Sequence, residues 1–318
     1  KIDESIVSAF EVLRKRIDKF GVTQPNIQRL GTSGRILVEL PGAKDVERVQ
    51  NLLQSTAQLE FWETYKNDEL ITFLVEANQY LKTTNDKSKA VVEEEKDDAS
   101  EIDDLLADVS AQDSISASGS NPILDRIVGQ GFQGGPVLAQ FASRDSELIL
   151  DYLNQPQVRK LLPSEYRYIQ FAWGKPVANS DVVELYALKS NRDNLAPLSG
   201  GVVVDALQTF DQVGNAAVSM QMDSRGARIW ESMTGKAFKE ASNIAIVLDD
   251  IVYSAPGVSS GPIAGGRSEI TGNFTLNEAI DLANVLRAGK LPASAEIIQS
   301  EIVGPSLGQE AIEAGIYS

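Results

Sequence analysis

Residues 83–121 form the segment that most limits how this chain can fold. They contain eleven acidic residues, three lysines and no aromatic residue, and serine is frequent among the rest. Such a composition buries too little apolar surface to offset the entropy lost on ordering, so we expect a largely disordered insertion. The segment carries a net charge of −8, which is half of the −16 of the whole chain. The remaining sequence must therefore fold as parts that precede and follow it.

The overall charge and two missing residue types exclude several classes of function. A net charge of −16 repels phosphate backbones, so nucleic acid is not an expected partner. The absence of cysteine excludes disulfides, thiolate metal sites and thiol catalysis. The absence of histidine removes the usual general base and the commonest metal ligand. We therefore expect no catalytic residue, no cofactor and no metal site. A carboxylate-based hydrolase is the enzyme alternative, although no convincing acid pair is visible.

Hydrophobic periodicity predicts an alternation of helices and strands before the acidic segment. Ile6, Phe10, Leu13, Ile17 and Phe20 recur at steps of four and three, which is typical of one apolar helix face. The expected elements are a helix at 4–20, strands at 26–30 and 35–40, a helix at 45–55, a strand at 58–64 and a short helix at 66–81.

The chain after the acidic segment continues the same alternation. Thr275 and Glu278 form a capping box, and Asp223 or Ser224 can cap another helix. The expected helices are 146–153, 157–162, 225–238 and 276–287, and the expected strands are 166–173, 182–189, 202–210, 216–222, 243–248, 251–254 and 295–303.

This pattern predicts the α+β class, with helices on one face of mostly antiparallel sheets. The two outer parts, residues 1–64 and 191–318, share this pattern and are expected to form a split ferredoxin-like fold, with an α+β part at 65–190 inserted between them.

Three short motifs have both a structural and a functional interpretation. The "GQGFQG" of 129–134 matches a dinucleotide-binding pattern, but a loop is the better interpretation because no helix pattern follows it. Asp249-Asp250 is interpreted as an acidic turn between strands. The aromatic stretch "EYRYIQFAW", 165–173, fits either a core strand or an apolar surface for extended polypeptide.

Longer motifs resemble a known family. "NIAIVLDDIVYSAPGV", "GGRSEITGNFTLNEAIDLANVLRAGKLPAS" and "EIVGPSLGQEAI" resemble the large periplasmic region of the SecD family of protein-export subunits. The N-terminal "VLRKRIDKFGVTQPNIQRLGTSGRILVELPGAKDVERVQNLLQSTAQLEFWE" resembles the other half of that region. The resemblance covers about residues 5–63 and 198–314, whereas the acidic segment departs from the family pattern.

The resemblance implies a non-enzymatic domain on the periplasmic side of the bacterial inner membrane. Residues 1–64 and 191–318 would be the base of such a domain and 65–190 its inserted head, with hinges near 64–66 and 191–201. The domain would capture preprotein emerging from the SecYEG channel and move by head–base rotation coupled to the proton-motive force. Its partners would be SecF, SecYEG and unfolded preprotein, with membrane attachment through helices outside this chain and preprotein contacts within 121–190. A periplasmic domain of a related proton-driven efflux transporter is the alternative.

Signature positions of the family are expected to have a structural role. They are Arg287, Ala288, Gly289, Leu291, Pro292, Gly304, Pro305, Ser306, Leu307 and Gly308. Ser306 and Gln309 also form a capping-box pattern, which predicts a helix start. The resemblance implies that 304–318 leads into a transmembrane helix, and its last turns are expected to be frayed. The longest uninterrupted apolar run, Ile244–Leu248, has only five residues, whereas a membrane span needs about 20.

Overall fold

The computed structural model describes residues 2–20, 25–31, 34–41, 46–54, 56, 58–94, 121–177, 180–289, 291 and 297–300. The chain divides into two compact units: Lys1–Thr56 with Leu291–Ser318, and Ala57–Lys290. Every pair of named strands is antiparallel, and helices accompany each unit. The predicted α+β class is therefore confirmed.

The first unit contains two helices and a hairpin, in the order that the sequence predicts. Leu13, Ile17 and Val49 are buried, together with Leu291 from the later segment. The Leu291 amide donates to the Thr56 carbonyl at 2.9 Å, so the two segments of this unit meet. The expected strand at 295–303 is not seen in 297–300, and its other residues lie outside the described ones. The elements are α1 (Ile2–Phe20), β1 (Asn26–Leu30), β2 (Arg35–Glu39) and α2 (Val46–Gln54).

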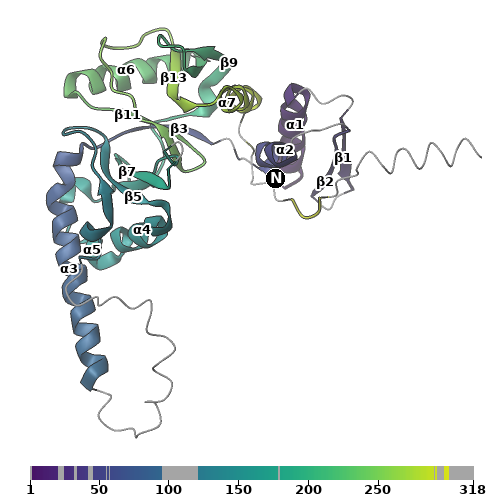
Figure 1. The fold of residues 1–318 in the computed structure, drawn as a ribbon. Helices are drawn as coiled ribbons and strands as arrows, with labels where there is room; N and C mark the ends of the chain where they lie inside the picture. Colours follow the sequence, from purple (N-terminus) through teal and green to yellow (C-terminus); the bar gives the residue numbers. More distant parts are fainter. Residues whose placement is uncertain are drawn as a thin grey trace, which may run out of the picture. The chain divides into compact units, whose positions relative to one another are not determined.

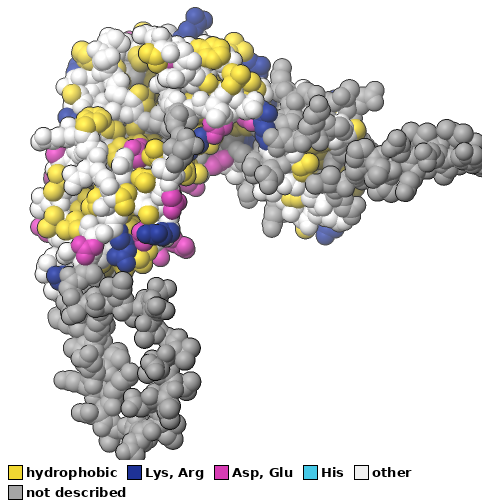
Figure 2. Space-filling model, viewed as in Figure 1, with side chains coloured by type: hydrophobic (Ala, Val, Ile, Leu, Met, Phe, Trp, Pro, Cys, Tyr) yellow, Lys and Arg dark blue, Asp and Glu magenta, His cyan; other side chains and the backbone are white. Residues whose placement is uncertain are grey.

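The second unit contains three sheets, ordered β12-β11-β3-β8, β4-β5-β7-β6 and β13-β10-β9. Figure 1 shows α3, α4 and α5 beside β5 and β7, and Figure 2 shows the surface in the same view. The helices are α3 (Asn67–Glu94), α4 (Ser146–Asn154), α5 (Pro156–Arg159), α6 (Ser224–Glu240) and α7 (Leu276–Ala288). The strands are β3 (Leu59–Glu63), β4 (Ile127–Gly129), β5 (Val137–Ala142), β6 (Gln170–Trp173), β7 (Val182–Leu188), β8 (Leu198–Ser199), β9 (Val203–Phe210), β10 (Ala216–Met222), β11 (Ile244–Leu248), β12 (Ile251–Ser254) and β13 (Arg267–Phe274).

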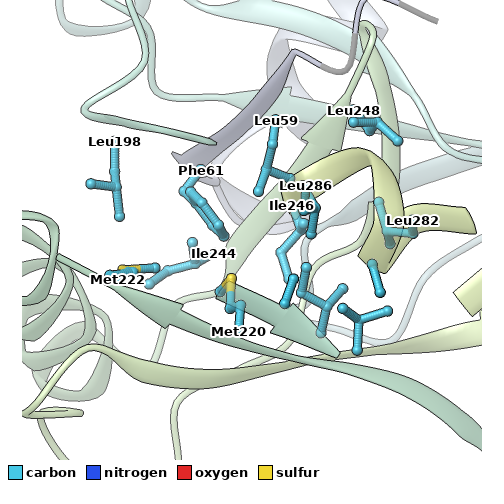
Figure 3. Packing of buried hydrophobic residues seen from close by; sticks show 14 of the residues in the cluster. Leu59, Phe61, Leu198, Met220, Met222, Ile244, Ile246, Leu248, Leu282 and Leu286 are labelled. Carbon is cyan, nitrogen blue, oxygen red and sulfur yellow. The ribbon is translucent and has the colours of Figure 1, made fainter. Parts of the chain in front are cut away.

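Strand β11 is buried along its whole length because it separates two apolar clusters. Successive side chains of a strand point to opposite faces, so a strand that is covered on both sides is apolar throughout. On one face, Ile244, Ile246 and Leu248 pack in a cluster with buried side chains of α6, α7 and β10. Figure 3 shows Ile244 by Met222 of β10 and Ile246 near Leu286 of α7, all in this cluster. This explains why β11 reads as a continuous apolar run.

The other face of β11 packs against the sheet that contains β7. Ala245 and Val247 share a buried cluster with Trp62 of β3 and with Tyr186 and Leu188 of β7. This apolar layer joins the two four-stranded sheets. The Thr64↔Leu188 and Gly174↔Val252 bridges continue the contact at the strand ends.

The observed boundaries therefore differ from the expected ones. Residues 65–190 share the apolar layer with β3, β11 and β12, so Ala57–Lys290 is one compact unit. The expected hinge at 64–66 lies inside this unit, where the Thr64 amide donates to the Asn243 carbonyl at 3.1 Å. The chain instead crosses between units at 56–57 and 290–291.

Helix α3 corrects the expected extent of the acidic insertion. The sequence predicts a helix that ends at residue 81 and disorder from residue 83, but α3 continues to Glu94. Disorder is therefore the wrong interpretation for 83–94, and 95–120 lie outside the described residues. Leu70, Leu74 and Leu81 anchor the earlier turns of α3 in a core. Once a helix is nucleated, each added residue gains one backbone hydrogen bond, so the helix can propagate beyond the anchored turns.

The start of α7 confirms the predicted capping box. The Thr275 amide donates to the Glu278 carboxylate at 2.8 Å, and the Glu278 amide donates to the Thr275 hydroxyl at 3.3 Å. The same carboxylate pairs with Lys175, from the segment after β6. Partial burial raises the pKa of Glu278, but Lys175 and the two Thr275 bonds outweigh this effect and lower it overall.

Replacing Glu278 by glutamine should destabilise the protein only where the carboxylate is charged. A group whose pKa is lowered by folding stabilises the folded state above its unfolded pKa, and this contribution is lost as pH falls through the folded pKa. We expect Glu278→Gln to reduce the free energy of unfolding by up to about 1 kcal/mol at pH 7. The difference should vanish at acidic pH, below the ordinary pKa of glutamate. Denaturant unfolding at several pH values measures it, with the exposed Glu269→Gln as control. A difference that stays constant down to pH 3 would contradict the ion-pair role.

Candidate polypeptide-binding surface

The signature residue Arg287 lies at the outer edge of strand β9. Its Nη2 donates to the Ala206 carbonyl at 2.6 Å, and its Nε lies 3.1 Å from an Asp205 carboxylate oxygen. The Ala206 amide, in turn, donates to Asp205 at 3.0 Å. Arg287 and Asp205 together satisfy both backbone groups of Ala206. Arg287 thus links the last turn of α7 to the outer edge of β9.

The register of the hairpin shows which backbone groups of β9 point away from the sheet. In an antiparallel pair, alternate residues direct their N–H and C=O groups to the partner strand. The Asp211 amide donates to the Asn215 carbonyl at 2.9 Å, which closes the ladder with β10. Ala206, Gln208 and Phe210 are out of phase with Asp211, so their groups face outward. In the described part of the chain, nothing outside the sheet bonds the backbone of Gln208 or Phe210.

Strand β9 exposes large apolar side chains on both of its faces. Val204 is 60% exposed, Leu207 53% and Phe210 58%, and Val213 extends the row into the turn. Figure 2 shows hydrophobic side chains gathered over the part of the unit where Figure 1 labels β9 and β13. Edge strands of soluble proteins usually carry lysine, proline or bulges that prevent pairing with other chains. The sequence of β9, VVDALQTF, contains neither lysine nor proline, and the irregularity in its pairing with β10 lies near its start, at Val204.

The other signature positions have structural surroundings where they are described. Ala288 is buried in the last turn of α7. Gly289 ends that helix with φ of +88°, a conformation that favours glycine. Leu291 is buried in the first unit. Pro292 and the positions from Gly304 to Gly308 lie outside the described residues, as does the expected lead-in helix.

Within the expected contact region 121–190, a glycine-rich loop presents an exposed aromatic ring. Phe132 is 70% exposed. The buried Asn67 holds the loop by donating to the Phe132 carbonyl at 2.9 Å and accepting from the Gly134 amide at 2.9 Å. A Cβ at Gly131 would lie 2.5 Å from the Val137 carbonyl oxygen, so only glycine fits beside β5. The loop interpretation of 129–134 is confirmed, and the loop is anchored.

The second half of the aromatic stretch 165–173 lies in the core. Ile169, Phe171 and Ala172 are buried at β6, which confirms the core-strand interpretation for 169–173, whereas Arg167 and Tyr168 are exposed. An open hollow of about 400 Å³ borders this stretch. Arg159 lines it, and its Nη2 donates to the Ile169 carbonyl at 2.8 Å. Burial lowers the pKa of Arg159. The bonds of Arg159 thus hold the chain in place at the hollow.

The acidic pair after β11 forms a tight turn. Asp249 and Asp250 have φ of 49° and 66°, and Asp249 accepts a bond from the Gln58 amide at 3.0 Å. The predicted acidic turn is thus confirmed. Among the residues described, no three acidic side chains gather where they could hold a metal ion. No described helix has the length and apolar character needed to cross a membrane.

Two family models match separate parts of the chain. Residues 6–66 match the N-terminal part of the P1 domain of the protein translocase subunit SecDF. Residues 184–293 match the SecDF P1 head subdomain. Together these matches cover more than half of the chain, and they define it as part of a protein translocase subunit. The chain belongs to the SecD/SecDF family and contains its P1 domain. The head match covers α6, α7 and β9–β13, which the sequence analysis assigned to the base.

Individual relatives agree with this assignment. The chain is 39% identical to protein translocase subunit SecD of Rhodothermus marinus and 31% identical to that of Calditerrivibrio nitroreducens. Each match covers 99% of this chain but only 49% and 44% of the relatives, so the chain spans about half their length. The chain is also similar to a crystal structure of SecDF in a super-membrane-facing form, with 25% sequence identity and a TM-score of 0.50. The match covers 99% of this chain and 30% of the SecDF chain.

Sequence reasoning did not identify the edge of β9 as a candidate surface. Its signal was the run from Val202 to Leu207, which is apolar at all but one position. Such a run predicts a strand covered on both faces. In the structure Ala206 is the only fully buried residue of β9, so the apolar run predicted burial and gave no sign that this strand is exposed.

Proposed function

We propose that this chain is the substrate-handling part of a SecD-type translocase subunit on the periplasmic side of the inner membrane. Its second unit captures unfolded preprotein that leaves the SecYEG channel, with SecF as a further partner. Movement between the two units is coupled to the proton-motive force through membrane helices outside this chain. The domain performs no catalytic step itself.

The division into two units joined at only two chain crossings supports this proposal most directly. A binding module that must move relative to its anchor needs a stable core and few connections. Ala57–Lys290 has such a core in its three apolar clusters. It also has exposed apolar surface at Phe132 in the expected contact region and at Leu207 on β9. Exposed apolar side chains suit an unfolded chain, whose own apolar residues are uncovered.

Single-cysteine crosslinking of a stalled preprotein should label the second unit. These 318 residues contain no native cysteine, so an introduced cysteine is the single attachment point for a photo-crosslinking probe within them. Cysteines elsewhere in the translocase are replaced first. We expect probes at Leu207 and Phe132, placed in the complete translocase, to crosslink the preprotein several times more strongly than a probe at Leu37.

Leu37 is the matched control because it is an exposed leucine on strand β2 of the first unit. Probe accessibility is checked with a small maleimide reagent before each comparison. Equal preprotein labelling from all three positions would contradict capture by the second unit.

A further inference from the structure

We propose that the outer edge of β9 binds an extended segment of the exported polypeptide as an additional strand, and that Arg287 gates this edge. The inference rests on the proposed function, because it takes the unfolded preprotein as the partner. It adds the mode of recognition, which is pairing through the backbone, and a residue that controls it.

Backbone pairing allows one site to bind many different sequences, which pockets for specific side chains do not. A translocase subunit handles many sequences, and the main chain is the feature that every unfolded polypeptide shares. Strand addition uses these main-chain hydrogen bonds for affinity. The outward N–H and C=O groups of Gln208 and Phe210 supply the matching donors and acceptors. Leu207, Phe210 and Val204 add apolar contacts for alternate side chains of the bound segment.

The position of β9 makes it the suitable edge of this unit. Its sheet has two outer strands, β9 and β13, each of eight residues. Strand β13 is flanked by β12, because Tyr253 of β12 stacks on Phe274 of β13 at 6.0 Å. The edge strands β4 and β8 have three and two residues. Strand β6 has four residues, and Gly174, directly after it, forms an isolated bridge with Val252 of β12. Helix α7 packs against β9, but no described group outside the sheet bonds the backbone of Gln208 or Phe210. In the described part of this unit, the outer edge of β9 is therefore the longest strand edge with outward backbone groups left for a new strand.

Arg287 and Asp205 close this edge at its centre. They occupy both outward groups of Ala206, which a pairing strand would need in order to continue past Gln208. A bound strand must therefore displace the Arg287 bond to the Ala206 carbonyl. Since Arg287 belongs to the last turn of α7, one residue before the end of the helix, a shift of that turn would open or close the edge.

Binding of a synthetic peptide to the whole chain tests the mode of recognition. The probe is a fluorescent ten-residue peptide of alternating valine and threonine, compared with the same peptide N-methylated at every amide. Full N-methylation removes the donors on both edges of the peptide but keeps its side chains. Fluorescence anisotropy should show that the N-methylated peptide binds about tenfold more weakly, because several hydrogen bonds are lost. Equal binding of the two peptides would overturn the proposal.

Variants of β9 and α7 locate the peptide. Gln208→Pro removes one outward donor without removing a ladder bond to β10, so it should weaken binding, whereas Gln208→Ala should not. Arg287→Ala should strengthen binding about fivefold, because one competing bond is lost. Lys236→Ala, which breaks an ion pair with Glu63 away from this edge, should leave binding unchanged. Circular dichroism checks that each variant is folded. If Gln208→Pro does not fold, the difference in affinity between the unmodified and the N-methylated peptide for the wild-type chain tests the proposal.

Each remaining outcome separates this proposal from the function on which it rests. If neither peptide binds but preprotein crosslinks to Leu207 in the translocase, strand addition is wrong and substrate capture stands. If neither peptide binds and no crosslink forms at Leu207 or Phe132, both proposals fail. Dimerisation of Arg287→Ala without tighter peptide binding would show that the edge pairs with a second copy of the chain, which also overturns the proposal.

Discussion

Replacing Phe61 by alanine should lower the free energy of unfolding of the second unit by about 3–5 kcal/mol. Phe61 is fully buried on β3, and its ring lies edge-on to Trp230 of α6 at 5.2 Å between centroids. Truncation loses both the transfer free energy of the ring and its contacts with the surrounding cluster, and it leaves a cavity. Because β3 pairs with β11 and β8, the loss should affect the whole unit.

Chemical denaturation followed by tryptophan fluorescence measures this effect, since Trp62 and Trp230 both lie in the unit. Phe132→Ala is the matched control, because it removes the same side chain from a position that is 70% exposed. It should change stability by less than about 0.5 kcal/mol. Similar losses in the two variants would show that Phe61 is not a core residue.

Replacing Asn78 by alanine should cost about 2–4 kcal/mol and loosen the chain that follows the acidic segment. Asn78 is buried, and its side-chain oxygen Oδ1 accepts hydrogen bonds from the backbone amides of Ile123 at 3.0 Å and Leu124 at 3.2 Å. Its Nδ2 donates to the side-chain oxygen of Asn121 at 3.1 Å. Alanine leaves these donors without a partner, and each unbonded buried group costs about 1–3 kcal/mol. Hydrogen exchange of the Ile123 and Leu124 amides should become faster than in the wild type.

Gln79→Ala provides the control for the Asn78 substitution. Gln79 is the next residue on α3 and is exposed, so its replacement changes helix propensity without removing a buried bond. It should leave exchange at residues 123 and 124 unchanged. If exchange rises equally in both variants, Asn78 does not position this segment.

Most local elements could be predicted because their physical signals are local. The amphipathic pattern of α1, the Thr275–Glu278 capping box and the Asp223 cap of α6 depend on residues within a few positions of each other. Strand β13 was missed because its sequence, RSEITGNF, contains glycine and polar residues that weaken the alternation. Its pairing with β10 supplies the hydrogen bonds that its composition does not predict.

The candidate site was predicted less well than the elements. Long motifs led to the SecD family and marked Arg287 as a signature position, and the family matches confirm the first of these. The contact between Arg287 and β9 joins residues about 80 positions apart, so no sequence pattern specifies it. The expected contact region 121–190 remains a proposal, with Phe132 as its exposed anchor.

The sequence by itself determined the α+β class, the positions of most helices and strands, and the absence of cysteine and histidine chemistry. Tertiary structure alone decided that β3 pairs with β11, nearly 190 residues later, and that 57–290 form one unit. It also decided that β9 is an open edge. The reason is that periodicity reveals which face of an element is apolar, while the surface that covers that face, or leaves it exposed, depends on backbone hydrogen bonds and packing between distant segments.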